Sequence, residues 1–549
     1  MHLLKFFKSH YFDWILLFLF AFTLRIIGVN YGLPFEHHPD DEGIFGFVDQ
    51  AIDSGKILNP GVYSYGGIHY YFLTFTSLLA RTFINTSYIR EYEILFTRVA
   101  MVLIVSVSVV LLYEIARKLV KDRFAAFFTA AFAAVSVVSV MFSRFTTVDG
   151  LIILFVMITV LVSIAYFEKG KTKTLFWMFA LAGLTVSLKI SYTLFLLYPV
   201  FVYSLKKKFR FNIKKDFLIF SKLLFISILF FIIGNIFEVF HFTTWVGRNI
   251  YFYKTYSSPE YFYFKLVKPN YFEHLFSIVK LIFADYFIIT KNTVWIALGT
   301  LLLFIWKGYN FYKSNKNKFF LAILFPALFI LFAASRQIFL IRTVFPAAPL
   351  LLIVLLYPLR LQKIHQVAYK FVVLVLFLLV FAGTINALAD LQKKDAEKIV
   401  TNFINTNKGI FAVPYSFSFP SIEYAHYGVD ERLNLFKHNF FNTNRDKLIF
   451  YKKEDDLINT FSKTDYVVLS QQMFQSIDYR KSNELRLEPV YDFVDISKDA
   501  EIENVLRQLD FYPVTEVETS DYEMIAQYDP ASLSKKKFTV YKKGNKLEK

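Results

Sequence analysis

The chain has 549 residues, of which 56% are hydrophobic, and its mean hydropathy is +0.43. This composition excludes an ordinary soluble protein and predicts a polytopic membrane protein, because soluble domains cannot bury so much apolar surface. The formal net charge is +17, but Lys and Arg of membrane proteins gather in cytoplasmic loops, so we expect no nucleic-acid partner. The absence of Cys excludes thiol catalysis, disulfides and Cys-ligated metals.

The first apolar stretch, residues 12–29, follows Lys5 and Lys8. It resembles a signal peptide, but no small-residue cleavage site follows, so we expect an uncleaved first span. Further stretches of near-spanning length are residues 94–115, 124–142, 150–166, 175–188, 190–205, 217–236, 292–306, 319–334, 343–358 and 370–389. The predicted fold class is therefore a polytopic α-helical membrane protein with about 11 transmembrane helices.

Two of these stretches, 175–188 and 190–205, are short for full spans and are separated by Lys189. We expect a tight helical hairpin with Lys189 at its tip.

The run 68–84 is apolar and aromatic but contains His69 and Arg81. If it does not span the membrane, the basic loops between later spans share a side with Lys5 and Lys8, as the positive-inside tendency requires. We therefore expect an amphipathic helix on the outer surface, a cytoplasmic N-terminus and insertion in the plasma membrane.

The composition changes after Asp390 to an ordinary charge density with strand-like runs at 466–469 and 538–541. We expect two domains: a transmembrane module, 1–390, with outer loops 30–93 and 237–291, and an extracytoplasmic soluble α/β domain, 391–549. The aromatic run 251–264 suits a membrane interface.

Three consecutive acids, Asp40, Asp41 and Glu42, follow the first span and would be costly in hydrocarbon, so we expect them at the membrane surface. A carboxylate there can take a proton from an acceptor hydroxyl, and Arg or Lys can stabilise charge on a departing phosphate. Alternatively, the acids could only cap a helix beginning near Gly43. The same topology places further charged residues on the outer face: Arg144, Asp149, Lys189, Arg336 and Arg342.

Several short motifs occur in chain order between residues 30 and 390. They are His-Pro-Asp-Asp-Glu at 38–42, Gly-Lys-Ile-Leu-Asn-Pro at 55–60, Tyr-Gly-Gly-Ile-His-Tyr at 65–70, Ser-Arg-Phe-Thr-Thr-Val-Asp at 143–149, Gly-Leu-Thr-Val-Ser-Leu-Lys at 183–189, continuing to Tyr192, and Arg-Thr-Val-Phe-Pro at 342–346. Together they resemble the GT-C superfamily of membrane glycosyltransferases, in particular family 39, which includes protein O-mannosyltransferases and the lipid A aminoarabinose transferase. One acid is additional to the family's His-Pro-Asp-Glu motif, and the usual Pro near the surface helix is missing.

The resemblance implies an inverting hexosyl or pentosyl transfer from a polyprenyl- or dolichyl-phosphate sugar to a protein, lipid or glycan acceptor outside the membrane. By this resemblance Asp41 is the general base, with Asp40 as its competitor. The other implied roles are orientation of the acceptor or the base by Glu42, acceptor binding by Asp149, phosphate binding by Lys189, Arg342, Arg336 and Arg144, and substrate contacts by His38, Tyr65 and His69. A divalent metal cation held by Asp41 and Asp149 is a possible cofactor.

Structural roles compete with these assignments. Arg144 and Asp149 could form an ion pair at the mouth of the bundle, Lys189 could extend its ammonium group to the surface, and Arg336 and Arg342 could contact lipid headgroups. For the whole protein, the alternative function is a transporter or flippase for a lipid-linked saccharide. A non-catalytic scaffold and a polymerase or ligase of lipid-linked glycans also stay open.

Overall fold

The computed structural model describes residues 10–30, 39–57, 65–84, 90–210, 212–237, 241–243, 245–247, 249–250, 271–287, 294–334, 345–358, 363–393, 400, 403–404, 406–407, 409–414, 448–451, 456–470, 472–477, 490–495, 500–509, 511–518 and 537–543. The chain forms two compact units. The helical unit contains Met1–Val29, Phe47–Leu79 and Ile94–Leu388, and the mixed unit contains Asn30–Gly46, Ala80–Glu93 and Ala389–Lys549.

Every predicted apolar stretch contains a helix. In chain order the helices up to residue 393 are α2 (His10–Ile26), α3 (Pro39–Asp53), α4 (Gly67–Phe83), α5 (Arg90–Val120), α6 (Arg123–Val135), α7 (Val137–Phe142), α8 (Asp149–Lys169), α9 (Thr172–Leu188), the 3-10 helix η1 (Ile190–Leu196), α10 (Leu197–Lys206), α11 (Ile213–Gly234), α14 (Tyr271–Lys280), the π-helix η2 (Leu281–Asp285), α15 (Val294–Ser314), α16 (Lys316–Ala334), α17 (Ala348–Leu355) and α18 (Lys363–Lys393).

Among the described residues, five helices are long and apolar enough to cross a membrane: α5, α8, α11, α15 and α18. Large apolar side chains on their surfaces stay exposed, including Phe217 on α11 (72%), Trp295 on α15 (80%) and Phe371 on α18 (66%). Exposed apolar faces of this kind suit contact with lipid. These helices are those of an integral membrane protein.

The stretch 124–142, which we predicted as one span, is broken at Ser136 into α6 and α7. Ser136 leaves the helical conformation (ψ 123°), and its hydroxyl caps α7 by accepting a hydrogen bond from the Ser139 amide. A break inside an apolar bundle requires new donors for the freed carbonyls of α6. The Thr384 hydroxyl of α18 donates to one of them, Val135 O.

Arg25 supplies the other donors at this break. It is fully buried on α2, and its guanidinium donates to Ala134 O (3.0 Å), Ala133 O (3.3 Å) and Ser139 Oγ (2.7 Å). These two carbonyls belong to the last turn of α6, where the helix dipole favours a cation. Arg25 therefore joins α2 to both halves of the broken helix.

A second polar cluster joins the start of α2 to α5 and α6. Arg123 donates two hydrogen bonds to the buried Asp13 carboxylate, at 2.7 and 2.8 Å, and the Tyr113 hydroxyl donates a third at 2.6 Å. Beside it, the Trp14 indole donates to Glu114 at 2.7 Å. Charge-assisted bonds of this geometry fix the relative position of the three helices.

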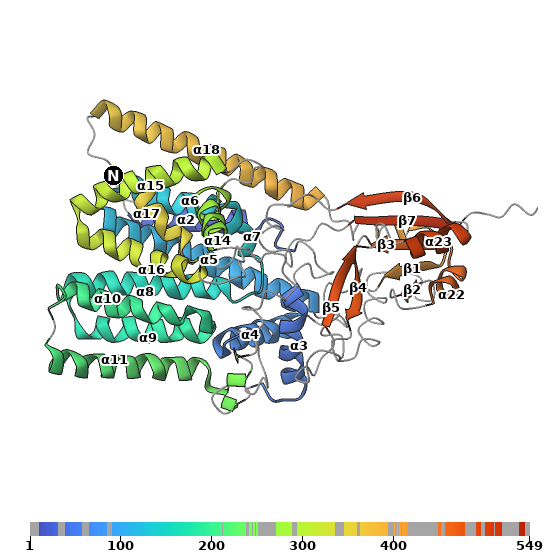
Figure 1. Ribbon diagram of the computed structural model, residues 1–549, viewed down its shortest axis with the longest axis horizontal. Coiled ribbons are helices and arrows are strands. Elements are labelled where there is room, and N and C mark those ends of the chain that lie inside the picture. The colour runs from blue at the N-terminus through green and yellow to red at the C-terminus, as the bar shows by residue number, and fades with distance from the viewer. Residues whose placement is uncertain are drawn as a thin grey trace, which may run out of the picture. The chain divides into compact units, whose positions relative to one another are not determined.

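Helices α8, α9 and α11 pack side by side in that order (Figure 1). Gly183 allows the close contact between α9 and α11, because a Cβ at this position would overlap the Ser227 carbonyl. The chain reverses at Lys189, which has an extended backbone (φ −158°, ψ 115°) between α9 and η1. Lys189 thus lies at the turn between the two helical segments, as the sequence predicts.

The mixed unit contains a five-stranded sheet in the order β2-β1-β3-β7-β6. Its strands are β1 (Phe411–Pro414), β2 (Leu448–Tyr451), β3 (Tyr466–Ser470), β6 (Phe511–Glu518) and β7 (Lys537–Lys543). Strand β1 is parallel to β2 and β3, whereas β7 is antiparallel to β3 and β6. A separate antiparallel pair is formed by β4 (Gln472–Ile477) and β5 (Val490–Asp495). Both sequence-predicted strands are present, as β3 and β7.

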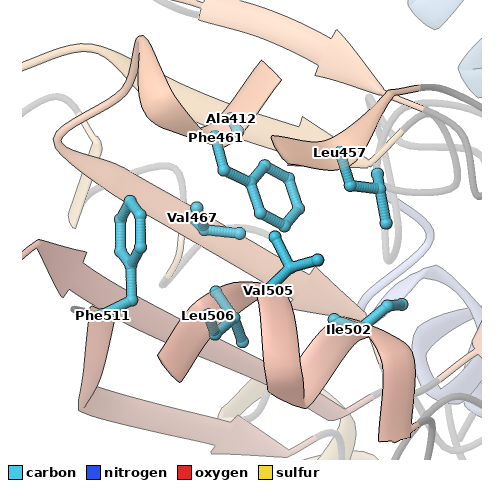
Figure 2. Packing of buried hydrophobic residues seen from close by; sticks show 8 residues of the cluster. All are labelled: Ala412, Leu457, Phe461, Val467, Ile502, Val505, Leu506 and Phe511. Atoms are coloured by element: carbon cyan, nitrogen blue, oxygen red, sulfur yellow. The ribbon is translucent and has the colours of Figure 1, made fainter. Parts of the chain in front are cut away.

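Two helices, α22 (Leu457–Ser462) and α23 (Ala500–Gln508), pack on this sheet. Figure 2 shows Phe461 of α22 and Val505 of α23 close to Val467 of β3, in one buried apolar cluster. The alternation along β3 places Tyr466 on the other face, where its ring stacks on Phe411 (centroids 4.6 Å apart).

Replacing Arg25 tests the importance of the α6 break. In Arg25→Leu, two buried carbonyls and the Ser139 hydroxyl lose their donor, so we expect the free energy of unfolding in mixed micelles to fall by about 2 kcal/mol. The matched control is Arg117→Leu, which removes a partly exposed ion pair with Glu114 and should cost less than about 1 kcal/mol. Equal losses in the two variants would contradict the assignment.

Candidate active site

Two of the sequence motifs meet in the helical unit. The Gly66 amide donates to Leu188 O (3.1 Å), and the Gly67 amide donates to Asn235 Oδ1 (3.0 Å). Gly66 has no room for a side chain, because a Cβ would overlap the Ser187 carbonyl. The start of α4 is therefore held against the end of α9, next to Lys189.

His69 joins the same segment to the loop before α8. Its side chain is fully buried, and Nε2 lies 2.7 Å from Thr146 O. A carbonyl can only accept, so Nε2 carries the proton in this bond. The Tyr65 ring packs edge-on against His69, with centroids 5.4 Å apart. His69 and Tyr65 therefore lie next to the loop that leads to Asp149. Contact of these two side chains with substrate stays a prediction.

Tyr70 fixes the other side of α4. Its hydroxyl donates to Ile57 O at 2.9 Å, which ties α4 to the segment after α3. Burial raises the pKa of Tyr70, so the phenol keeps the proton that this bond needs.

Asp149 and Lys189 form an ion pair. Asp149 is the first residue of α8, where the helix dipole favours a carboxylate, and it is only 1% exposed. Lys189 Nζ lies 3.5 Å from Asp149 Oδ1, and 22% of the Lys189 side chain is exposed. The pair therefore joins a buried carboxylate to a lysine whose side chain is partly exposed.

Two polar atoms next to this pair have no hydrogen-bond partner among the described residues: Asp149 Oδ2 and the Tyr192 hydroxyl. Tyr192 is 1% exposed and its ring stacks on Phe329, with centroids 4.8 Å apart and an interplanar angle of 22°. Asp149 lies near enough for its charge to act on the Tyr192 hydroxyl. Tyr192 belongs to the motif that begins at Gly183, and its position three residues after Lys189 is the sequence signal for a role in this site.

Arg144 is held by the end of α2. Its guanidinium donates to Arg25 O (3.2 Å) and Leu24 O (3.3 Å), and the residue is 4% exposed. The ion pair that the structure shows for Asp149 is with Lys189. A contact between Arg144 and a phosphate stays a prediction.

The remaining predicted residues are only partly covered by the structure. Asp40, Asp41 and Glu42 lie in the first turn of α3, and the structure describes their backbone but not their side chains. His38, Arg336, Arg342 and the aromatic run 251–264 lie outside the described residues. Within the part of the chain that the structure describes, no group of three His, Asp or Glu side chains could hold a metal ion.

Comparison with known families addresses the predicted resemblance. Residues 86–237 match the sequence profile of the family described as "Dolichyl-phosphate-mannose-protein mannosyltransferase". This region of the chain carries the family's sequence pattern. The match supports the predicted GT-C resemblance, and it includes both Asp149 and Lys189.

The chain was also compared with curated protein sequences and with solved structures. No curated protein sequence matches the chain. Among solved structures, the chain is similar to ArnT from Cupriavidus metallidurans bound to undecaprenyl phosphate, with 12% identity, a TM-score of 0.46, and coverage of 96% of this chain and 98% of ArnT. For the apo state of the same ArnT the identity is 12%, the TM-score 0.48 and the coverage 97% and 98%.

A mutant cycle tests the coupling of Asp149 and Lys189. Lys189→Met leaves the buried Asp149 carboxylate without its cation and should lower the free energy of unfolding by about 2 kcal/mol, less than for a fully buried pair because Lys189 is partly exposed. In the double variant Lys189→Met/Asp149→Asn the unpaired charge is gone, so about half of this loss should be recovered. Strictly additive losses would contradict a coupled pair.

Proposed function

We propose that the protein is a glycosyltransferase that uses a lipid-phosphate-linked sugar as donor. The observation that carries the proposal is the family match over 86–237, a region in which the structure pairs Asp149 with Lys189. The ammonium group of a partly exposed lysine supplies the positive charge that the phosphate of the donor requires.

The proposed reaction inverts the anomeric centre. Asp41 removes the proton of the acceptor hydroxyl, whose oxygen attacks the anomeric carbon of the donor. The bond from that carbon to the phosphate oxygen breaks on the opposite face, and the lipid phosphate leaves with the electron pair. Asp40 competes with Asp41 for the role of base, and Glu42 orients the acceptor.

Lys189 acts on the leaving group in this scheme. Its ammonium stabilises the negative charge that grows on the departing phosphate. Asp149 supports it, since the ion pair at 3.5 Å limits the positions that the flexible Lys189 side chain can adopt. Arg144, Arg336 and Arg342 are further phosphate-binding candidates from the sequence.

We propose that the reaction takes place on the extracytoplasmic side, with the N-terminus in the cytoplasm. The support is the distribution of Lys and Arg between the apolar stretches of the sequence. The donor is proposed to carry a hexose or a pentose on a polyprenyl or dolichyl phosphate, and the acceptor is a protein, lipid or glycan.

A divalent cation between Asp41 and Asp149 stays a prediction. The described residues do not form a metal site by themselves, because Asp149 is the single described carboxylate of the pair and Lys189 already places a positive charge beside it. We therefore derive no step through a metal.

A transporter of lipid-linked saccharides is the alternative, and the helix break at Ser136 is the feature of the structure that bears on it. Broken helices in transporters present free backbone groups to ions or substrate. Here the freed carbonyls Ala133, Ala134 and Val135 accept bonds from Arg25 and Thr384 instead. The break therefore gives the transporter reading little support.

The proposed base is tested by Asp41→Asn in purified protein. With undecaprenyl-phosphate mannose as a first donor and native membrane extract as acceptor, we expect sugar transfer to fall at least about a hundredfold, because amide nitrogen cannot act as a base. Asp40→Asn is the matched control and should retain most of the activity. Full activity in Asp41→Asn with loss in Asp40→Asn would reassign the base.

The outcome that favours a transporter has two parts. The purified wild-type protein transfers no sugar in this assay, and vesicles that contain the protein move labelled donor across their bilayer. That result would replace the proposal with the transporter alternative.

A further inference from the structure

Tyr192 and Asp149 share one property. Both are at least nine-tenths buried, and each keeps one polar atom without a hydrogen-bond partner among the described residues. A buried polar atom left without a partner costs about 1–3 kcal/mol, so folded proteins keep few of them. Two such atoms in one place indicate a group of the substrate that completes their bonds.

The chemistry of the two atoms restricts that group. Asp149 Oδ1 lies 3.5 Å from Lys189 Nζ, and the other oxygen of this carboxylate, Oδ2, is a hydrogen-bond acceptor. The Tyr192 hydroxyl can donate and accept. A hydroxyl group can donate to the first atom and can either accept from or donate to the second, so neighbouring hydroxyls of a sugar ring satisfy both.

Charge determines which part of the donor, the sugar or the phosphate, lies next to which residue of this site. An anionic phosphate is attracted by the Lys189 ammonium and repelled by the Asp149 carboxylate. A neutral sugar is free of that repulsion, and its ring is joined to the phosphate by a single bridging oxygen. A phosphate on the Lys189 side therefore leaves the sugar on the side of Asp149 and Tyr192.

We propose that Asp149 Oδ2 and the Tyr192 hydroxyl bind hydroxyl groups of the donor sugar, an assignment that rests on the proposed glycosyltransferase function. Tyr192 is a specificity-determining residue in this site. Phe329 holds its ring by stacking, so the hydroxyl is already positioned before the donor arrives.

The proposal makes an unusual prediction about stability. Tyr192→Phe keeps the stacked ring and removes a hydroxyl that has no partner among the described residues, so thermal stability should be unchanged or higher. The matched control is Tyr198→Phe on the adjoining helix, where the buried hydroxyl donates to Leu321 O at 3.3 Å and its removal should lower stability.

Binding measurements with purified wild-type protein and both variants test the proposal. The probes are bare undecaprenyl phosphate and undecaprenyl phosphate carrying mannose, glucose or 4-amino-4-deoxyarabinose. For the sugar that binds wild type most tightly, Tyr192→Phe should weaken binding about tenfold, the value of one hydrogen bond, and should leave binding of the bare carrier unchanged. Tyr198→Phe should bind both as wild type does.

Each other outcome overturns one part of the account. If no sugar strengthens binding over the bare carrier, or if Tyr192→Phe binds the sugar-loaded carrier like wild type, the sugar site is wrong. If Tyr192→Phe weakens both probes equally, the residue has only a structural role. If wild type binds neither the bare nor any loaded carrier, the proposed function itself fails.

Discussion

Cationic side chains on the C-terminal carbonyls of neighbouring helices hold the helical unit together. The last carbonyls of a helix have no partner within it, and in an apolar bundle water cannot supply one. A Lys or Arg from another part of the chain can donate hydrogen bonds to these carbonyls. Its positive charge also interacts favourably with the negative end of the helix dipole. The bonds of this kind run from Arg25 to α6, Arg144 to α2, Lys206 to α8 and Lys318 to α5, and Lys307 donates to Tyr357 O just beyond the end of α17. Each one holds a helix end, or the segment next to it, against another part of the chain.

The proposed site is built on two of these bonds. Arg144 lies in the loop that ends at Asp149, so its bonds to Leu24 and Arg25 hold that loop against α2. His69 of α4 holds the same loop through Thr146 O. The loop that leads to Asp149 is therefore held by contacts with both α2 and α4.

Hydrophobic runs predicted the helices well, since each apolar stretch contains one, and the strand-like runs at 466–469 and 538–541 are strands. The position of Lys189 at a reversal also followed from the sequence, because a charged residue between two short apolar runs cannot stay in hydrocarbon. The break at Ser136 could not be predicted, because it depends on donors more than a hundred residues away, Arg25 and Thr384. The bonds of Arg144 to the main-chain carbonyls of Leu24 and Arg25 could not be predicted for the same reason, because these residues are also more than a hundred positions away.

The central claim is that the ammonium group of Lys189, held by Asp149, receives the phosphate of a lipid carrier. An electron cryo-microscopy map of the protein in nanodiscs with undecaprenyl phosphate tests it most directly. The account predicts phosphate density in hydrogen-bond contact with Lys189 Nζ and on the side away from Asp149. Phosphate density at another buried cation, such as Lys307 on α15, with none at Lys189, would contradict it.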